Sequence, residues 1–310
     1  MKKVLLAIAA IVIVLGLVLY FAAAPFLINK TVNKMRSEAG LTIKSVNIPD
    51  FKIVYAEGGT GDTIIMLHGF GANKDRWLGF AKLLTPKYRV IIPDIPGFGD
   101  SSKPQDKNYN YTSQIERLNL FAKELKLTKF HLVGNSMGGA IAGDYAATYP
   151  EMVKTLALFD AAGLNPPIKS EWFLLLDKGI NPLIVKDVNN YDKFLEFAFL
   201  KPPQMPSFIK KYMAKQAIAA APFNEKIFKD LVTEAFILEN KLDKITVPTL
   251  IVWGDSDRML HIYSVPVFEK NIKNSKAVII KQCGHMFIME NHRKQWSKFN
   301  RFNQVIANTP

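Results

Sequence analysis

The segment Gly134-Asn135-Ser136-Met137-Gly138 constrains the fold of this 310-residue chain more than any other. It follows a short apolar run, residues 130–133, and opens a segment rich in Gly and Ala, residues 138–147. A Gly-x-Ser-x-Gly pattern between a strand and a helix is typical of a nucleophile elbow, because glycine leaves room for a strained turn that raises the serine hydroxyl off the sheet. An ordinary Gly-rich turn is the alternative, but the flanking strand and helix patterns favour the elbow. Ser136 is therefore our candidate nucleophile.

Short β-branched runs alternate with helical patterns along most of the chain. The runs that predict strands are residues 51–55, 63–67, 89–93, 130–133, 155–159, 249–253 and 277–281. The helical patterns that separate most of them are residues 75–84, 113–125, 137–149, 265–271 and 286–305. This order predicts an α/β fold with a mostly parallel sheet and helices on both faces, and it leaves open an antiparallel first pair of strands.

The strand patterns stop in residues 163–242, where the chain has many prolines and is rich in aromatic side chains such as Trp172, Phe194 and Phe228. A structureless loop of this length is uncommon in a compact domain. We therefore predict a helical cap at residues 163–242, inserted into a core of residues 51–162 and 243–310. The aromatic side chains could form only the cap's own core, or they could line a site for an acyl chain, and the two roles are compatible.

The N-terminal segment predicts a membrane anchor. Residues 4–28 carry no charged side chain, and about 20 helical residues are enough to cross a bilayer. We predict an anchor at residues 1–28 and a stalk at residues 29–50. A start with two lysines before a long apolar run resembles a bacterial signal anchor, which would place the catalytic domain in the periplasm, on the outer side of the inner membrane, although the positive-inside rule does not decide the orientation. The alternative is secretion after cleavage at Ala22-Ala23-Ala24, which Pro25 and the length of the apolar run disfavour.

Charge and cysteine content restrict the partners. Lys and Arg outnumber Asp and Glu by 40 to 27, which gives a net charge of +13. The basic residues are dispersed and form no nucleic-acid motif, so we expect no nucleic-acid partner. Attraction to anionic lipid and a merely soluble basic surface both remain open. Cys283 is the only cysteine, so no intramolecular disulfide can form, and we expect it to be a small buried side chain.

A serine hydroxyl is a weak nucleophile near neutral pH, so it needs an imidazole to accept its proton and a carboxylate to orient that imidazole. Asp257 follows the strand at residues 249–253, and His285 follows the next strand. Since the carboxyl ends of parallel strands lie at one edge of the sheet, both should meet Ser136 there. Asp255 is the rival acid, but the longer turn carries Asp257 farther from the strand end. We therefore predict Ser136, Asp257 and His285 as catalytic residues.

The turn His68-Gly69-Phe70-Gly71 follows the strand at residues 63–67 and lies at the same edge of the sheet. A tetrahedral intermediate carries an oxyanion that needs backbone N–H donors. We predict that the amides of Phe70 and Met137 form this oxyanion hole, and that His68 anchors the loop by hydrogen bonding.

Three segments together make the chain recognisable: residues 68–77 (HGFGANKDRW), 94–99 (DIPGFG) and 131–139 (HLVGNSMGG). From about residue 51 onward the chain resembles the α/β-hydrolase superfamily, and within it the branch of membrane-anchored monoacylglycerol lipases and bacterial lipases and esterases. The resemblance implies the same triad and the same oxyanion donors, with no cofactor and no metal ion. Serine at the elbow argues against the dehalogenase and epoxide hydrolase relatives, which have an aspartate there.

We therefore expect a serine hydrolase that cleaves carboxylic esters of lipids, with monoacylglycerols as the first candidates, by an acyl-enzyme mechanism. A carbon–carbon bond hydrolase of the same fold and a short-chain carboxylesterase are the alternatives. A non-catalytic binding protein is the last, because it would not need the complete set of catalytic positions.

Overall fold

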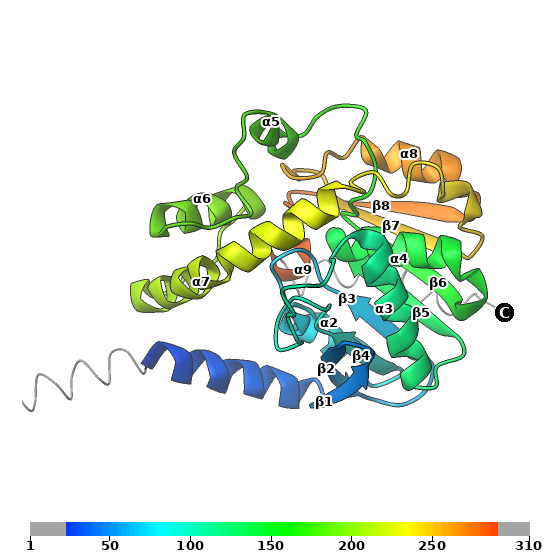
Figure 1. Ribbon diagram of the computed structural model, residues 1–310, viewed down its shortest axis with the longest axis horizontal. Coiled ribbons are helices and arrows are strands. Elements are labelled where there is room, and N and C mark those ends of the chain that lie inside the picture. The colour runs from blue at the N-terminus through cyan, green and yellow to red at the C-terminus, as the bar shows by residue number, and fades with distance from the viewer. Residues whose placement is uncertain (1–22, 291–310) are drawn as a thin grey trace, which may run out of the picture.

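In the computed structural model, which describes residues 23–290, the core is an eight-stranded sheet in the order β1-β2-β4-β3-β5-β6-β7-β8 (Figure 1). β1 pairs with β2 and β2 with β4 in antiparallel fashion, and the other neighbours are parallel. This confirms the predicted mostly parallel sheet. The strands are β1 (Leu41–Ile48), β2 (Phe51–Gly58), β3 (Thr63–Leu67), β4 (Arg89–Pro93), β5 (Phe130–Asn135), β6 (Val153–Phe159), β7 (Thr249–Gly254) and β8 (Ser275–Ile280).

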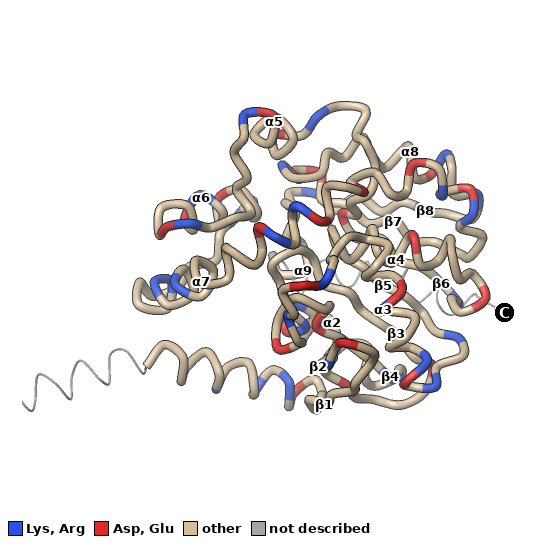
Figure 2. Tube along the Cα trace, viewed as in Figure 1, with Lys and Arg blue, Asp and Glu red and all other residues tan. Residues whose placement is uncertain are grey.

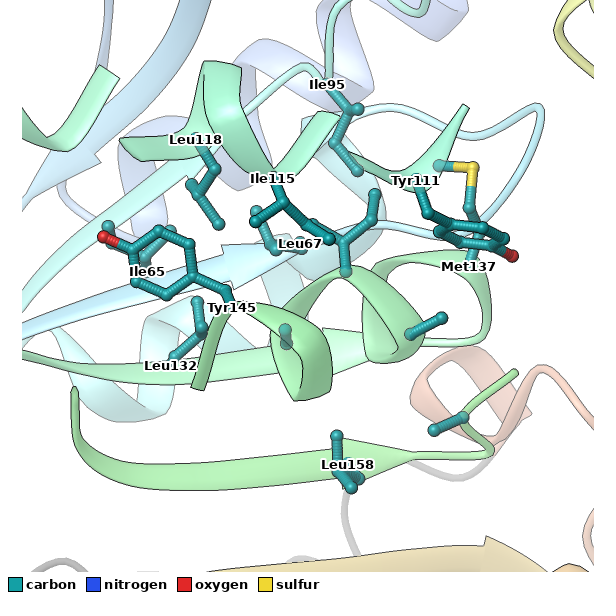
Figure 3. Packing of buried hydrophobic residues seen from close by; sticks show 14 of the residues in the cluster. Ile65, Leu67, Ile95, Tyr111, Ile115, Leu118, Leu132, Met137, Tyr145 and Leu158 are labelled. Atoms are coloured by element: carbon teal, nitrogen blue, oxygen red, sulfur yellow. The ribbon is translucent and has the colours of Figure 1, made fainter. Parts of the chain in front are cut away.

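Both faces of the sheet are buried, which explains why its central strands are apolar at consecutive positions. Along β3, Ile65 and Leu67 contribute to one hydrophobic cluster, whereas Ile64 and Met66 contribute to the other. Figure 3 shows Ile65, Leu67 and Leu132 of the first cluster packed beneath helix residues. The two-residue repeat of a strand thus divides one apolar run between two cores.

The helices pack on these two cores. Side chains of α3, α4 and α8 join the first cluster, and side chains of α2 and α9 join the second. These helices are α2 (Leu78–Leu84), which follows the 3₁₀ turn η1 (Lys74–Trp77), α3 (Tyr111–Glu124), α4 (Met137–Thr148), α8 (Ser264–Asn271) and α9 (Phe287–Glu290).

Three helices lie between β6 and β7, in the stretch predicted to be the cap: α5 (Glu171–Asp177), α6 (Val188–Ala198) and α7 (Ser207–Val232). In Figure 1, α6 and α7 extend away from the sheet, beyond the edge where the parallel strands end. Charged residues are scattered over the cap and the core without a continuous basic stripe (Figure 2).

Part of the stretch predicted to be a stalk, residues 29–50, belongs to the sheet of the core. The backbone is helical through residues 23–38, and β1 follows as the edge strand of the sheet. The side chains of residues 42–45 are all exposed, so β1 has no apolar alternation by which it could be recognised.

Most of the predicted anchor, residues 1–22, lies outside the described residues, as does the end of the helix predicted at residues 286–305 beyond α9. Among the helices of residues 23–290, none has both the length and the apolar character needed to cross a bilayer.

Candidate active site

Ser136 occupies a strained turn between β5 and α4. Its φ of 56° and ψ of −119° are unusual for a residue with a side chain, and the flanking glycines are required by close backbone packing. A Cβ added at Gly134 would collide with the carbonyl oxygen of Gly138. A Cβ added at Gly138 would lie 2.5 Å from the carbonyl oxygens of Leu67 and His68. The geometry is that of a nucleophile elbow, as the sequence predicts.

Asp257 and His285 form a buried pair. Asp257 Oδ2 lies 2.7 Å from His285 Nδ1, and Asp257 Oδ1 accepts hydrogen bonds from the amides of Met259 (2.7 Å) and Leu260 (3.0 Å). These contacts fix the carboxylate, which in turn holds a proton on Nδ1 and leaves Nε2 as the proton acceptor. His285 and Ser136 line the same cavity.

Asp255, the other candidate for the acid, makes different contacts from Asp257. It accepts hydrogen bonds from the Ser256 hydroxyl (2.9 Å) and from the amide of Cys283 (3.3 Å), so it organises the turn after β7. The structure therefore brings Asp257, and not Asp255, to the imidazole. Cys283 is buried, as expected for a small apolar side chain.

His68 anchors the loop that carries Phe70. Its Nε2 accepts a hydrogen bond from the amide of Ile95 (3.0 Å), and its Nδ1 lies 2.8 Å from the carbonyl oxygen of Gly69. Burial lowers the pKa of His68, which favours the neutral ring that these contacts need. The loop also approaches the elbow closely, because a Cβ on Gly69 would lie 3.2 Å from Ser136 Cβ.

The other end of this loop is held by a buried ion pair. Lys74 Nζ lies 2.7 Å from Asp94 Oδ2 and 2.5 Å from Asp100 Oδ2, and the Lys74 amide donates to Asp94 Oδ1 (2.7 Å). The Asp100 amide also donates to Asp94 Oδ2 (2.8 Å). Phe70 is thus held between two fixed residues, His68 and Lys74.

Two cavities meet at Ser136. The first, which we call the cap cavity, lies beneath α5 and α7 and is lined by Trp172, Phe173, Leu176, Phe228, Leu231 and Val232, together with Met137 of the elbow. The second, which we call the loop cavity, is lined by His68, Gly71, Arg76, His285, Met286 and Met289. Phe70, Leu183 and Met259 border both cavities, so they form the boundary between them.

Asp160 lies directly after β6 and was missed in the sequence, where a lone Asp has no distinctive spacing. Its Oδ1 accepts the amide of Gly254 (2.9 Å), and one ligand-type atom from each of Asp160, Asp257 and His285 lies within 4.8 Å of the others. Three such groups could in principle hold a cation. Asp257 instead makes hydrogen bonds to His285 and to two amides, which is the arrangement expected of the acid and the base of the predicted triad.

The remaining histidines lie elsewhere. His131 is buried within β5 against Thr155, with Nδ1 2.8 Å from the threonine hydroxyl. His261 Nδ1 accepts the amide of Tyr263 (3.3 Å), and His292 lies outside the described residues.

A mostly parallel sheet with a serine elbow after β5, an acid after β7 and a histidine after β8 defines the class of α/β hydrolases. The chain belongs to the alpha/beta hydrolase fold family, whose model matches residues 62–292.

Relatives with curated names include Lipase 1 of Psychrobacter immobilis, which is 34% identical over 90% of this chain and 89% of the relative. Monoacylglycerol lipase ABHD6 of Mus musculus is 32% identical over 88% of this chain and 86% of the relative. A solved structure described as a membrane phospholipase A and a bacterial virulence factor superposes with a TM-score of 0.91. It is 41% identical over 99% of this chain and 100% of the solved chain.

Proposed function

We propose that this protein is a serine hydrolase that cleaves carboxylic esters of lipids. The observation that carries the proposal is the buried Asp257–His285 pair beside the cavity that contains Ser136, on a strained elbow. The relatives named lipase, monoacylglycerol lipase and phospholipase A support the same reaction class.

The proposed mechanism proceeds through an acyl-enzyme. His285 Nε2 takes the hydroxyl proton as Ser136 Oγ attacks the ester carbonyl, and Asp257 stabilises the imidazolium that results. The amides of Phe70 and Met137 hold the oxyanion of the tetrahedral intermediate. His285 then protonates the leaving alcohol, and water releases the acyl group by the same steps. The cycle uses no metal ion and no organic cofactor.

The cap cavity favours an apolar acyl chain. Its lining includes two aromatic rings of α5, Trp172 and Phe173, and one of α7, Phe228. Ser136 is the one residue of the nucleophile, acid and base that borders it. An acyl chain bound there would lose its contact with water while its carbonyl carbon reached Oγ. Monoacylglycerols and other lipid esters with a single exposed acyl chain fit this arrangement.

We also propose that residues 1–28 anchor the enzyme in a bacterial inner membrane, with a periplasmic active site. The absence of charge in residues 4–28 and the 41% identity to a membrane phospholipase A support an anchor. The net charge of +13 would add attraction to anionic lipid.

The test is hydrolysis by the full chain, solubilised in neutral detergent, of monoacylglycerols of increasing chain length and of matched p-nitrophenyl esters. Ser136→Ala should abolish turnover, and Ser45→Ala, on the exposed side of β1, is the matched control. A preference for medium or long acyl chains supports the lipid-ester proposal. Activity on short esters alone would indicate a short-chain esterase, and no activity on any of these esters would overturn ester hydrolysis as the function.

A further inference from the structure

The two cavities that meet at Ser136 differ in charge. Among the described residues that line the cap cavity, none is charged. The loop cavity contains one guanidinium, that of Arg76, and also the imidazole of His285. The two sides of an ester bound at Ser136 would therefore lie in different environments.

Arg76 belongs to a run of three charged residues on η1, of which the first two are paired. Lys74 is held by Asp94 and Asp100, as described above. Asp75 accepts two hydrogen bonds from Arg36, at 2.9 Å and 2.7 Å, in a bidentate pair. Neither neighbour therefore has Arg76 as its main partner.

The guanidinium of Arg76 makes one hydrogen bond to another side chain, from Nη1 to Met289 Sδ (3.2 Å). Among the side chains that the structure describes, no carboxylate makes an ion pair or a hydrogen bond with it. Burial lowers the pKa of Arg76, and the electrostatic interactions with Tyr191 and Asp75 oppose that effect. A partly buried guanidinium whose side-chain hydrogen bond goes to a thioether has other N–H donors available, and these donors match the oxygens of a phosphate or a carboxylate.

The position of Arg76 relative to Ser136 indicates which part of a substrate it would contact. An acyl chain in the cap cavity places the ester carbonyl at Oγ, so the alcohol part of the ester extends into the loop cavity beside His285. His285 must protonate that same alcohol as it leaves. An anionic group on the alcohol would therefore lie within the cavity that contains Arg76.

We propose that Arg76 binds a phosphate group on the alcohol side of the substrate, so that glycerophospholipid esters are preferred over neutral acylglycerols. This inference rests on the proposed ester hydrolysis and assigns the specificity of the same site. Arg76 determines specificity through binding and takes no part in proton transfer.

The test compares two substrates with the same acyl chain, 1-oleoyl-lysophosphatidylglycerol and 1-oleoylglycerol, in neutral detergent with the full chain. Arg76→Met should lower kcat/KM for the phosphate ester by about 10-fold to 100-fold, as expected for a lost charge-assisted hydrogen bond. For the neutral ester the change should be less than about twofold, because the acyl contacts are untouched. Arg76→Lys should retain part of the preference, since it keeps the charge but loses the bidentate geometry.

Lys129→Met is the matched control, because it removes one exposed positive charge before β5, at the end of the strand away from the elbow. An equal loss of phosphate-ester activity in this control would overturn the proposal in favour of general surface attraction. An equal loss on both substrates in Arg76→Met would also overturn it, since the residue would then support the fold of the loop. If Arg76→Met does not fold, Arg76→Gln, which also removes the positive charge, is compared on the phosphate ester and the neutral ester in the same way.

Inhibition by inorganic phosphate separates a site for lipid-borne phosphate from one for any free phosphate. Weak inhibition together with the Arg76-dependent substrate preference supports the lipid-borne source. Strong inhibition that disappears in Arg76→Met would indicate a site for free phosphate and overturn the lipid assignment. If the wild-type protein hydrolyses neither ester, the proposed function itself fails, which is a different result from loss of the preference alone.

Discussion

The buried His131 should make the stability of this protein depend on pH in mildly acidic solution. The ring lies within β5, 2% exposed, with Nδ1 2.8 Å from the Thr155 hydroxyl and the edge of Tyr88 against it. Burial lowers the pKa of His131 from 6.5 to about 4, and the charge of Lys154 acts in the same direction. Asp62, 3.7 Å from Nε2, opposes the shift but lies on an exposed turn.

The sign and the size of the effect follow from proton linkage. Between pH 6.5 and about 4 the unfolded chain binds a proton at this histidine that the folded chain does not, so stability falls as pH falls. The contribution is fully present above pH 6.5 and is lost on acidification toward the folded pKa. With these two pKa values, lowering the pH from about 7.5 to about 5 should cost about 2 kcal/mol.

His131→Gln removes the titrating group and can keep a hydrogen bond to Thr155. Urea denaturation of wild type and variant in neutral detergent, at about pH 7.5 and about pH 5, gives four free energies of unfolding. The wild type should lose about 2 kcal/mol more than the variant over this interval. Other groups such as His68 affect both proteins equally and cancel in the difference. Parallel pH profiles for the two proteins would refute the reasoning, because the imidazole would then titrate alike in both states.

Three further substitutions test the site and its support. Asp257→Asn should lower kcat on an ester substrate by about 10³-fold to 10⁴-fold without unfolding the protein, because an amide favours the wrong tautomer of His285. Steady-state kinetics measures kcat and a melting curve checks the fold. A decrease in kcat of less than about tenfold would contradict the prediction. Gly138→Ala should destabilise the protein by about 1–3 kcal/mol and abolish activity, since the added Cβ would lie 2.5 Å from two carbonyl oxygens. An unchanged melting temperature and unchanged turnover would mean that the backbone around the elbow can relax. Lys74→Met should lower the free energy of unfolding, measured by urea denaturation, by about 3 kcal/mol, because Asp94 is left buried without its cation. A loss below about 1 kcal/mol would show that the backbone amides of residues 74 and 100 alone satisfy the carboxylate of Asp94.

The sequence carried enough information for the central strands and the elbow because their patterns are local. β3 and β4 occupy the predicted residues 63–67 and 89–93, since both strands are buried on two faces and read as continuous apolar runs. The Asp257–His285 contact is long-range, but the rule that parallel strands end at one edge brings the two loops together.

The missed features lack a local signal. β1 lies at the edge of the sheet with mostly exposed side chains, so no alternation distinguishes it from a stalk. Arg76 reads as one more surface charge among 40 basic residues, and only the fold reveals that its neighbours are paired and that it borders the loop cavity. Asp160 reaches the His285 region because β6 lies beside β7, and strand order cannot be read from spacing.

The strained conformation of Ser136 is held by backbone hydrogen bonds to segments that also line or adjoin the cap cavity. A residue other than glycine in such a conformation costs about 1–3 kcal/mol unless the surrounding structure holds it. The Ser136 amide donates to the carbonyl oxygen of Phe159 at the end of β6 (2.9 Å), and its carbonyl oxygen accepts the amides of Gly139 (2.9 Å), Ala140 (3.1 Å) and Ala162 (3.1 Å). Ala162 lies where the chain leaves the core for the cap and borders the cap cavity. The proposed nucleophile and the start of the predicted cap are therefore fixed to one another by a direct hydrogen bond. An acyl chain bound in the cap cavity, as we propose, would for that reason also be positioned relative to Ser136 Oγ, which is the alignment that attack on an ester carbonyl requires.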